Sequence, residues 1–512
     1  MKIARRTFLA GLAASGAATA LPGMSRRAVA ADKPFVAVLS QNPDTIDLTS
    51  ATNAPSVAPA MENVNEPLIG RDAHGQPTPT LATWEIAPDG KAITFHLRKG
   101  VKFHSGDDFT AADVAFSVER MLAKVPTYKR NMAKLDRVEV VDPLTARFVL
   151  KAPSVDIIYG ARGAYIVSKA YYDRVGDKTF AAKPVGTGPY KLVDHQIGQH
   201  IDLAAFDGYW GGAPAVRQAR LRFITEESTR VAALQSGEVD LIMNTPFDRV
   251  AGLKKADFHI VGADVHPTTS VQITFGNPKM PWSDLKVRQA MAYAIDDKAI
   301  VDKLFDGIPK HYALFAPHEV GYDPSIEPYP YDPAKAKALL KEAGHPGGFD
   351  MRLVYWTGNY VGMRQTAEAV TLFWQAVGIR AKLDAYDPPH MMQLMRSSFA
   401  KRDTIDFVLL SPLPLANFAD PAYALNFAFS SHSPFSAYVN HAFDGIVAEA
   451  DATLDNDKRA ALVRQASKLL HGDVGCIPLW NNVSVFAMKP NVKLTPIDGG
   501  IALLPLKGVT VG

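Results

Sequence analysis

The clearest alternation of apolar and polar residues lies around position 95. Ile93, Phe95 and Leu97 fall on one side of an extended chain, which is typical of a strand with one buried face. Two further segments with strand character follow at 137–141 and 145–151. The pattern therefore predicts a group of short strands in the first third of the chain.

Helix starts are marked by residues that accept hydrogen bonds from free backbone N–H groups. Thr110 followed by Asp113 is a capping-box pattern, which predicts a helix after position 110. Asp284 predicts the N-cap of a helix that continues to about residue 295. Asp332, with proline at the next position, predicts another helix, and Gly344 is expected to end it.

The second half of the chain alternates between helical and strand patterns. Apolar residues at helical spacing run from 363 to 374, between strand patterns at 351–355 and 379–383. The range 183–244 predicts strand, strand, helix and strand in that order. Strands alternating with helices favour an open, wound sheet covered by helices, so the expected fold class is α/β.

The first 31 residues have the pattern of an export signal. Arg5-Arg6 precede an apolar run of about 14 residues, and Ala28-Val29-Ala30 has the form of a cleavage site. A membrane span needs roughly 20 apolar residues, so this run is too short for one. We expect a twin-arginine signal at 1–31, with an ordinary secretory signal as the alternative, and a mature chain in the periplasm.

Charge gives no reason to expect a polyanionic partner. The chain has 55 basic and 52 acidic side chains, and residues 1–31 hold five of the basic ones. The remaining sequence has 50 basic against 52 acidic side chains, a net charge of −2. We therefore expect no binding to nucleic acid or to an anionic membrane surface.

Cys476 is the only cysteine, so the fold has no internal disulfide to rely on. Its apolar surroundings in the sequence predict a buried, inert thiol. With no cysteine near the predicted cleavage site, we expect no lipid anchor and a soluble mature protein. The roughly 480 residues after the signal exceed one core of about 250–300 residues, so at least two domains are expected.

Five sequence blocks, in order, resemble a known family over residues 34 to about 505. They are similar to the extracellular solute-binding proteins of ABC importers, family 5, the dipeptide, oligopeptide and nickel type. The blocks are FHLRKGVKFHSG at 95–106, PVGTGPY at 184–190, DGYWGG at 207–212, ALQSGEVD at 233–240 and DLKVRQAMAYAID at 284–296.

The resemblance implies a two-lobe, hinged periplasmic binding fold with an additional α+β domain. Lobe I would comprise 32–71, 185–268 and 483–512, the extra domain 72–184, and lobe II 269–482. Ligand would lie between the lobes and be enclosed as they close.

The resemblance also suggests residues for binding a ligand's charged ends. In peptide-binding members an aspartate pairs with the ligand's α-amino group, and Asn417 stands at that position in ANFADP at 416–421. An amide binds an ammonium less strongly than a carboxylate does, so Asn417 is either a ligand contact or a residue that only satisfies its own loop backbone. Asp420 is either a replacement carboxylate or a turn residue before Pro421.

Arg364 is the counterpart of an arginine that holds the peptide carboxylate in dipeptide-binding relatives, or else a solvated residue on a helix face. Four aromatic residues follow predicted strand ends or lie in the 416–421 loop. They would either line the ligand space or belong to the core. They are Trp356, Tyr360, Tyr386 and Phe418.

Patterns for catalysis, cofactors and metals are missing from the sequence. Gly186-Thr187-Gly188-Pro189 lacks the Gly-Lys-Ser/Thr ending of a phosphate-binding loop. The histidines lack metal-ligand spacing, and the Gly-x-Ser-x-Gly elbow is absent. The acidic residues near Asp451 are expected on a solvated helix face. We expect no cofactor, no bound metal and no catalytic residues.

The sequence therefore predicts a monomeric receptor that delivers a small organic solute to the permease subunits of an ABC importer. Peptides are the leading ligand class. Opine-like conjugates and oligosaccharides follow because of Asn417, and a nickel chelate is a further alternative. An exported hydrolase and a sensory binding module are the competing classes of function.

Overall fold

The computed structural model describes residues 33–43, 45–51, 54–72, 77–274, 276–315, 317, 319–357, 361–413, 421–433, 436, 438–495 and 503–512. Pro34–Gly512 form one compact unit. Strands and helices alternate through much of it, which confirms the α/β class. No helix in these ranges is both long and apolar enough to span a bilayer.

The strands within these ranges are β1 (Phe35–Leu39), β2 (Ile69–Arg71), β3 (Pro77–Pro79), β4 (Ala82–Ile86), β5 (Ala92–Leu97), β6 (Leu135–Asp142), β7 (Thr145–Leu150), β8 (Tyr190–Gln196), β9 (His200–Ala205), β10 (Gln218–Phe223), β11 (Leu241–Ile242), β12 (His259–Gln272), β13 (Phe349–Trp356), β14 (Ile379–Tyr386), β15 (Phe407–Leu413), β16 (Cys476–Met488), β17 (Val492–Leu494) and β18 (Val509–Val511).

The α-helices within the same ranges are α1 (Ala54–Met61), α2 (Ala111–Lys124), α3 (Pro126–Asn131), α4 (Asp156–Arg162), α5 (Lys169–Ala182), α6 (Glu227–Gln235), α7 (Phe247–Lys255), α8 (Leu285–Tyr293), α9 (Asp297–Ala299), α10 (Pro333–Glu342), α11 (Met363–Gln375), α12 (Pro388–Phe399), α13 (Pro421–Phe429), α14 (His441–Ala452) and α15 (Asn456–Gly472). Short 3₁₀ turns lie at Pro281–Ser283, Arg402–Thr404 and Leu506–Gly508, and a π-helical turn at Ile300–Leu304.

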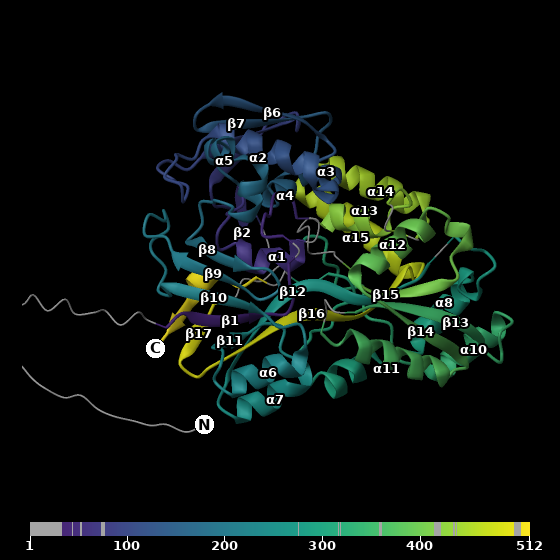
Figure 1. Ribbon diagram of the computed structural model, residues 1–512. Coiled ribbons are helices and arrows are strands. Elements are labelled where there is room, and N and C mark those ends of the chain that lie inside the picture. The colour runs from purple at the N-terminus through teal and green to yellow at the C-terminus, as the bar shows by residue number, and fades with distance from the viewer. Residues whose placement is uncertain are drawn as a thin grey trace, which may run out of the picture. The chain divides into compact units, whose positions relative to one another are not determined.

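One large sheet runs through the unit, in the order β14-β13-β15-β12-β16-β11-β1-β10-β9-β8. Helices α6, α7, α10 and α11 lie on one side of it, and α1, α12, α13 and α15 on the other (Figure 1). The long strands β12 and β16 pair antiparallel from His259–Met488 to Gln272–Cys476 and so connect its two halves.

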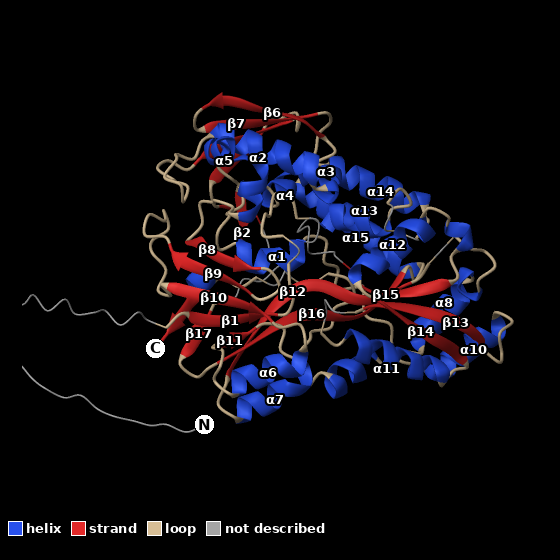
Figure 2. Cartoon of the chain, in the orientation of Figure 1, coloured by secondary structure: helices blue, strands red, loops and turns tan. Residues whose placement is uncertain are grey.

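A second, four-stranded sheet in the order β4-β5-β7-β6 lies apart from the large one and packs with α2 (Figure 2). The predicted alternation is confirmed in β5, where Ile93, Phe95 and Leu97 are buried. The predicted capping box is also confirmed. The Asp113 carboxylate accepts hydrogen bonds from the Thr110 backbone N–H and hydroxyl, both at 2.9 Å.

Other sequence predictions met mixed outcomes. The N-caps Asp284 and Asp332 are confirmed, because each carboxylate accepts from a first-turn backbone N–H. The order predicted for 183–244 was wrong, since three strands, β8, β9 and β10, precede α6. β9 and β10 do alternate in burial, with Ile201, Leu203, Ala219 and Leu221 buried, so the signal for a third strand was present in the sequence.

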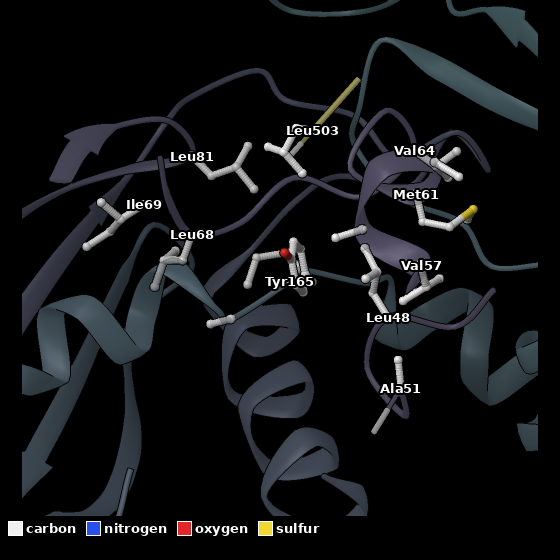
Figure 3. Close-up of a cluster of buried hydrophobic side chains, with 14 of the residues drawn as sticks. Leu48, Ala51, Val57, Met61, Val64, Leu68, Ile69, Leu81, Tyr165 and Leu503 are labelled. Atoms are coloured by element: carbon white, nitrogen blue, oxygen red, sulfur yellow. The ribbon is translucent and has the colours of Figure 1, made fainter. Parts of the chain in front are cut away.

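Hydrophobic cores divide the unit differently from the sheets. A single cluster joins β1 and β10 of the large sheet to β5, β7 and α2 of the small one. Leu48, Tyr165 and Leu503, far apart in sequence, lie together within it (Figure 3). A separate cluster holds α8, α10, α11 and β13. One hydrophobic core therefore extends from the small sheet to the side of the large sheet that contains β1.

Candidate functional site

The strand directions define one place where a ligand would meet both halves of the sheet. On one side, β10 and β11 run parallel to β1. On the other, β14 and β15 run parallel to β13. Open α/β sheets bind ligands beyond the carboxyl ends of their parallel strands.

The pairing register shows that the two sets of carboxyl ends point at each other. β11 pairs antiparallel with residues 487–488 of β16, and its next residues continue toward the middle of that strand. β15 pairs antiparallel with 268–272 of β12, and its last residue lies opposite Thr268. Both sets therefore end over the middle of the β12–β16 pair, which we take as the candidate site.

Beyond the carboxyl ends of β1 and β11, three polar side chains form a hydrogen-bonded chain. Nδ2 of Asn244 donates to Oγ of Ser40 at 2.6 Å, and Oγ of Ser484 donates to Oδ1 of Asn244 at 2.9 Å. Ser40 follows β1, Asn244 follows β11, and Ser484 lies on β16. One amide thus ties two strand ends to a connecting strand.

Asn244 has an unusual backbone, with φ of 52°. Asparagine tolerates this left-handed region better than most residues because its side chain finds local hydrogen bonds. The Asn244 carbonyl also accepts a hydrogen bond from Nη2 of the buried Arg230, whose Nη1 donates to the carbonyls of Ile224 and Thr225 after β10. Sequence reasoning missed this polar edge, since its residues come from four separate segments.

At the carboxyl ends of the parallel strands β13 and β14, the structure brings Trp356 and Tyr386 together. They are register partners at the carboxyl ends of β13 and β14. Both are half-buried and pack against the cluster that holds α12, and Nε1 of Trp356 donates to Oγ of Ser411 at 3.2 Å. These two aromatic residues lie where a wall of the candidate site would be.

Arg364 lies on a different face from that pair. It is exposed in the first turn of α11, and the buried residues of α11 pack into the cluster on the other side of the sheet. Trp356 belongs to the α12 side instead. The described geometry therefore does not bring Arg364 together with Trp356 and Tyr386. The other candidates, Tyr360, Asn417, Phe418 and Asp420, lie outside the described residues.

Two sequence blocks meet at one buried carboxylate, Glu66, rather than at the strand ends. The carboxylate accepts hydrogen bonds from the Thr187 hydroxyl at 2.8 Å, the Tyr209 hydroxyl at 2.8 Å and Nε1 of Trp210 at 2.9 Å. Burial raises the pKa of Glu66, and the three donors oppose that rise. Thr187 comes from the GTGPY block, and Tyr209 and Trp210 from DGYWGG.

The glycines of the GTGPY block have a steric role. A Cβ on Gly186 would lie 2.1 Å from the Val64 carbonyl oxygen, and one on Gly188 would lie 2.6 Å from that of Asn63. His104, from the first block, donates from Nε2 to the Gly188 carbonyl at 2.8 Å. Burial lowers the pKa of His104 to about 4, so its ring is neutral at pH 7. These blocks therefore hold the loop after β5, the 186–188 segment and residues 63–66 together.

Two further groups of reactive side chains lie away from the strand ends. Burial raises the pKa of the Cys476 thiol, and the residue is buried, as predicted. On β8 and β9, Nε2 of His200 lies 3.9 Å from Asp194 and 3.7 Å from Asp202. The three side chains are close enough to share a metal ion, but both oxygens of Asp202 already accept from Arg220 at 2.7 Å in an ion pair at the sheet edge.

Comparison with known proteins identifies the class. Residues 76–435 match the sequence profile of bacterial extracellular solute-binding proteins, family 5 Middle. The chain belongs to this family of solute-binding proteins.

Individual relatives cover nearly the whole chain. Glutathione-binding protein GsiB of Escherichia coli O1:K1 / APEC is 31% identical over 508 residues, 96% of each chain. Heme-binding protein A of Haemophilus influenzae is 31% identical over 450 residues, 81% of each chain. The solved periplasmic binding protein DppA from Helicobacter pylori, in complex with peptide STSA, matches with a TM-score of 0.78 and 26% identity, covering 94% of this chain and 98% of that one. The expected periplasmic binding fold is thereby confirmed.

Proposed function

We propose that this chain is the periplasmic receptor of an ABC importer and that it captures a peptide between two closing lobes. The observation that carries the proposal is the convergence of two sets of carboxyl strand ends over the strands β12 and β16. The named relatives bind glutathione, heme and a peptide, and glutathione is itself a peptide.

The domain bounds belong to the same proposal. Lobe I comprises 32–71, 185–268 and 483–512, the extra domain 72–184, and lobe II 269–482. In support, both lobe I–lobe II boundaries lie at an irregularity of the β12–β16 pairing, where Asp264 lies opposite Val483 but Thr268 lies opposite Asn481. A bulge of this kind is a place where paired strands bend.

Trp356 and Tyr386 are the described residues that we propose as ligand contacts, because they lie together beyond parallel strand ends. Aromatic faces accept varied side chains, as a peptide receptor requires. Asn417, Phe418, Asp420 and Tyr360 remain proposed contacts. For Arg364 the exposed position on the other face favours the alternative, a solvated helix residue.

The remaining parts of the proposal concern export and partners. Residues 1–31 act as a twin-arginine signal, and the mature protein is a monomer. It meets the permease subunits in its closed form and releases the ligand chemically unchanged.

The test is titration of the purified full chain with glutathione, the tetrapeptide Ser-Thr-Ser-Ala and heme, together with mass spectrometry of any molecule that co-purifies. We expect saturable binding of a peptide that is recovered intact. Heme, an opine, an oligosaccharide or a nickel chelate as the only ligand would overturn the peptide assignment. Turnover of chromogenic peptide or ester substrates would favour a hydrolase instead.

The site is tested by Tyr386→Ala, with Tyr331→Ala as the matched control. Tyr331 is another lobe II tyrosine, 46% exposed. Loss of an aromatic wall is expected to weaken binding about tenfold, whereas the control should stay within about twofold of the parent. Equal affinities for the two variants would place Tyr386 outside the ligand site.

A further inference from the structure

One short segment of the extra domain contacts lobe II. It comprises Arg130 and Asn131 at the end of α3 and Lys134 just before β6. Its partners lie on α13 and α14, about 290 to 320 residues later in the sequence. We call these contacts the 130–134 contact.

Two of the contacts are made to α13. The Tyr423 hydroxyl donates a hydrogen bond to Oδ1 of Asn131. The Arg130 guanidinium carbon lies 4.7 Å from the ring centroid of Phe427, a cation–π geometry. Tyr423 and Phe427 are one helical turn apart, and their rings stack at 6.4 Å, so the two contacts are made to one face of the helix.

The third contact is an ion pair with α14. Nζ of Lys134 lies 3.6 Å from Oδ2 of Asp451. The expectation that Asp451 lies on a solvated helix face was wrong, because its side chain is only 8% exposed and also accepts a hydrogen bond from Asn426 at 3.3 Å. The charge that offsets its negative charge comes from another domain, which helical periodicity cannot reveal.

A fourth approach lies beside these three. A Cβ on Gly90, in the turn between β4 and β5, would lie 3.1 Å from Cδ1 of Leu454 in the loop after α14. The extra domain thus touches lobe II through both a helix end and a strand turn.

In contrast to its contacts with lobe II, the extra domain shares a buried ion pair and a hydrophobic core with lobe I. The buried Arg120 of α2 forms an ion pair with the buried Asp47 at 2.5 Å, and the two regions share one hydrophobic core. Within the proposed bounds, lobe II joins lobe I through β12 and β16. Any movement of lobe II about these strands must therefore separate 130–134 from α13 and α14.

We propose that the 130–134 contact is a latch by which the extra domain favours the closed arrangement of the two lobes. The inference rests on the proposed function, since it assigns the extra domain a part in enclosing the ligand. The contacts described are non-covalent and mostly polar, and a latch that opens in each transport cycle requires contacts of this kind. They have no need to touch the ligand.

The test measures lobe separation without ligand. Val193→Cys in lobe I and Leu372→Cys in lobe II provide spin-label sites, because both side chains are about two-thirds exposed, at 64% and 66%. The buried Cys476 should not react with the label. Double electron–electron resonance then gives the fractions of molecules with a long and with a short distance between the two labels.

Three substitutions are tested in the doubly labelled chain: Asn131→Ala, Tyr423→Phe and Lys134→Ala. Each is expected to lower the ratio of short to long label distances about fivefold. Asn131→Ala and Tyr423→Phe together should lower it little more than either alone. Lys129→Ala is the matched control, because Lys129 is exposed on the same helix. It should leave the ratio unchanged.

A latch variant with the parent's distance distribution would overturn the proposal, as would a parent that shows only long distances. So would independent effects of Asn131→Ala and Tyr423→Phe. Thermal unfolding of each variant checks that the fold persists, since Tyr423→Phe keeps the packed ring. Because no ligand is needed, failure of glutathione to bind would count against the proposed function and leave this measurement intact.

Discussion

Residues in the most recognisable sequence blocks shape the protein rather than touch the candidate site. Gly186 and Gly188 allow two backbone segments to approach, and Thr187 donates to Glu66 between them. From sequence, GTGPY could be separated from a phosphate loop but not given a role. Its packing partners, Asn63 and Val64, lie more than 100 residues away.

Gly186→Ala and Gly188→Ala should each destabilise the fold by about 2 kcal/mol or more, because the added Cβ meets backbone oxygen that cannot move alone. Urea unfolding would measure the change. Gly252→Ala is the matched control, since a Cβ there meets nothing within 4 Å. In the middle of α7 it should be neutral or stabilising by about 0.5–1 kcal/mol. Similar losses at all three positions would rule out the steric explanation.

At the scale of elements, short-range signals were reliable and long strands were not. The caps at Thr110, Asp284 and Asp332 depend only on neighbouring residues, so sequence alone predicted them. β16 was predicted only in part, as an apolar, strand-like run over 477–480 after Cys476. All thirteen of its residues are buried, so it lacks alternation, and Asn481 and Asn482 interrupt its apolar character.

Asp113 shows how a cap can also join two helices. Its carboxylate accepts from Thr110 and, through Oδ1, from the Lys169 backbone N–H at the start of α5 at 2.9 Å. Asp113→Ala should therefore cost about 2–3 kcal/mol in unfolding free energy, and Thr110→Ala only about 1 kcal/mol. Glu119→Ala, at an exposed position of α2, serves as the control. Equal losses for Asp113→Ala and Thr110→Ala would show that the link to α5 contributes nothing.

At the scale of the whole molecule, sequence reasoning reached the α/β class and the resemblance supplied two lobes. The meeting of strand ends over β12 and β16 could not be read from sequence, because it depends on pairings such as Thr268 with Leu413. The same limit applies to the Asn244 chain and to the 130–134 contact. Each joins segments that no local pattern relates.

His104 is expected to make the stability of the fold sensitive to pH. Its ring lies 5.0 Å from that of Phe206, directly after β9, and its pKa falls from about 6.5 in the unfolded chain to about 4. A histidine with a lowered folded pKa stabilises the fold while neutral. That stability is complete above about pH 6.5 and is lost as pH falls toward 4, by at most about 3 kcal/mol.

Unfolding midpoints between pH 7.5 and 4 test this dependence. His104→Gln should remove the His104 contribution, so the difference in stability between parent and variant should shrink as the solution becomes more acidic. His96→Gln is the control, because the His96 side chain is 47% exposed in the same domain. A parent–variant difference that is constant with pH would contradict the assignment.

The shared sheet has a mechanical consequence. Backbone hydrogen bonds run from β14 to β8 through β12 and β16, so the two lobes are joined by a continuous sheet and not by flexible linkers. Closing the lobes would bend this continuous hydrogen-bonded sheet at its bulge. A sheet bent in this way would store elastic energy, which favours a return to the open form. Reopening after cargo is handed over would then be driven in part by elastic recoil of the protein itself.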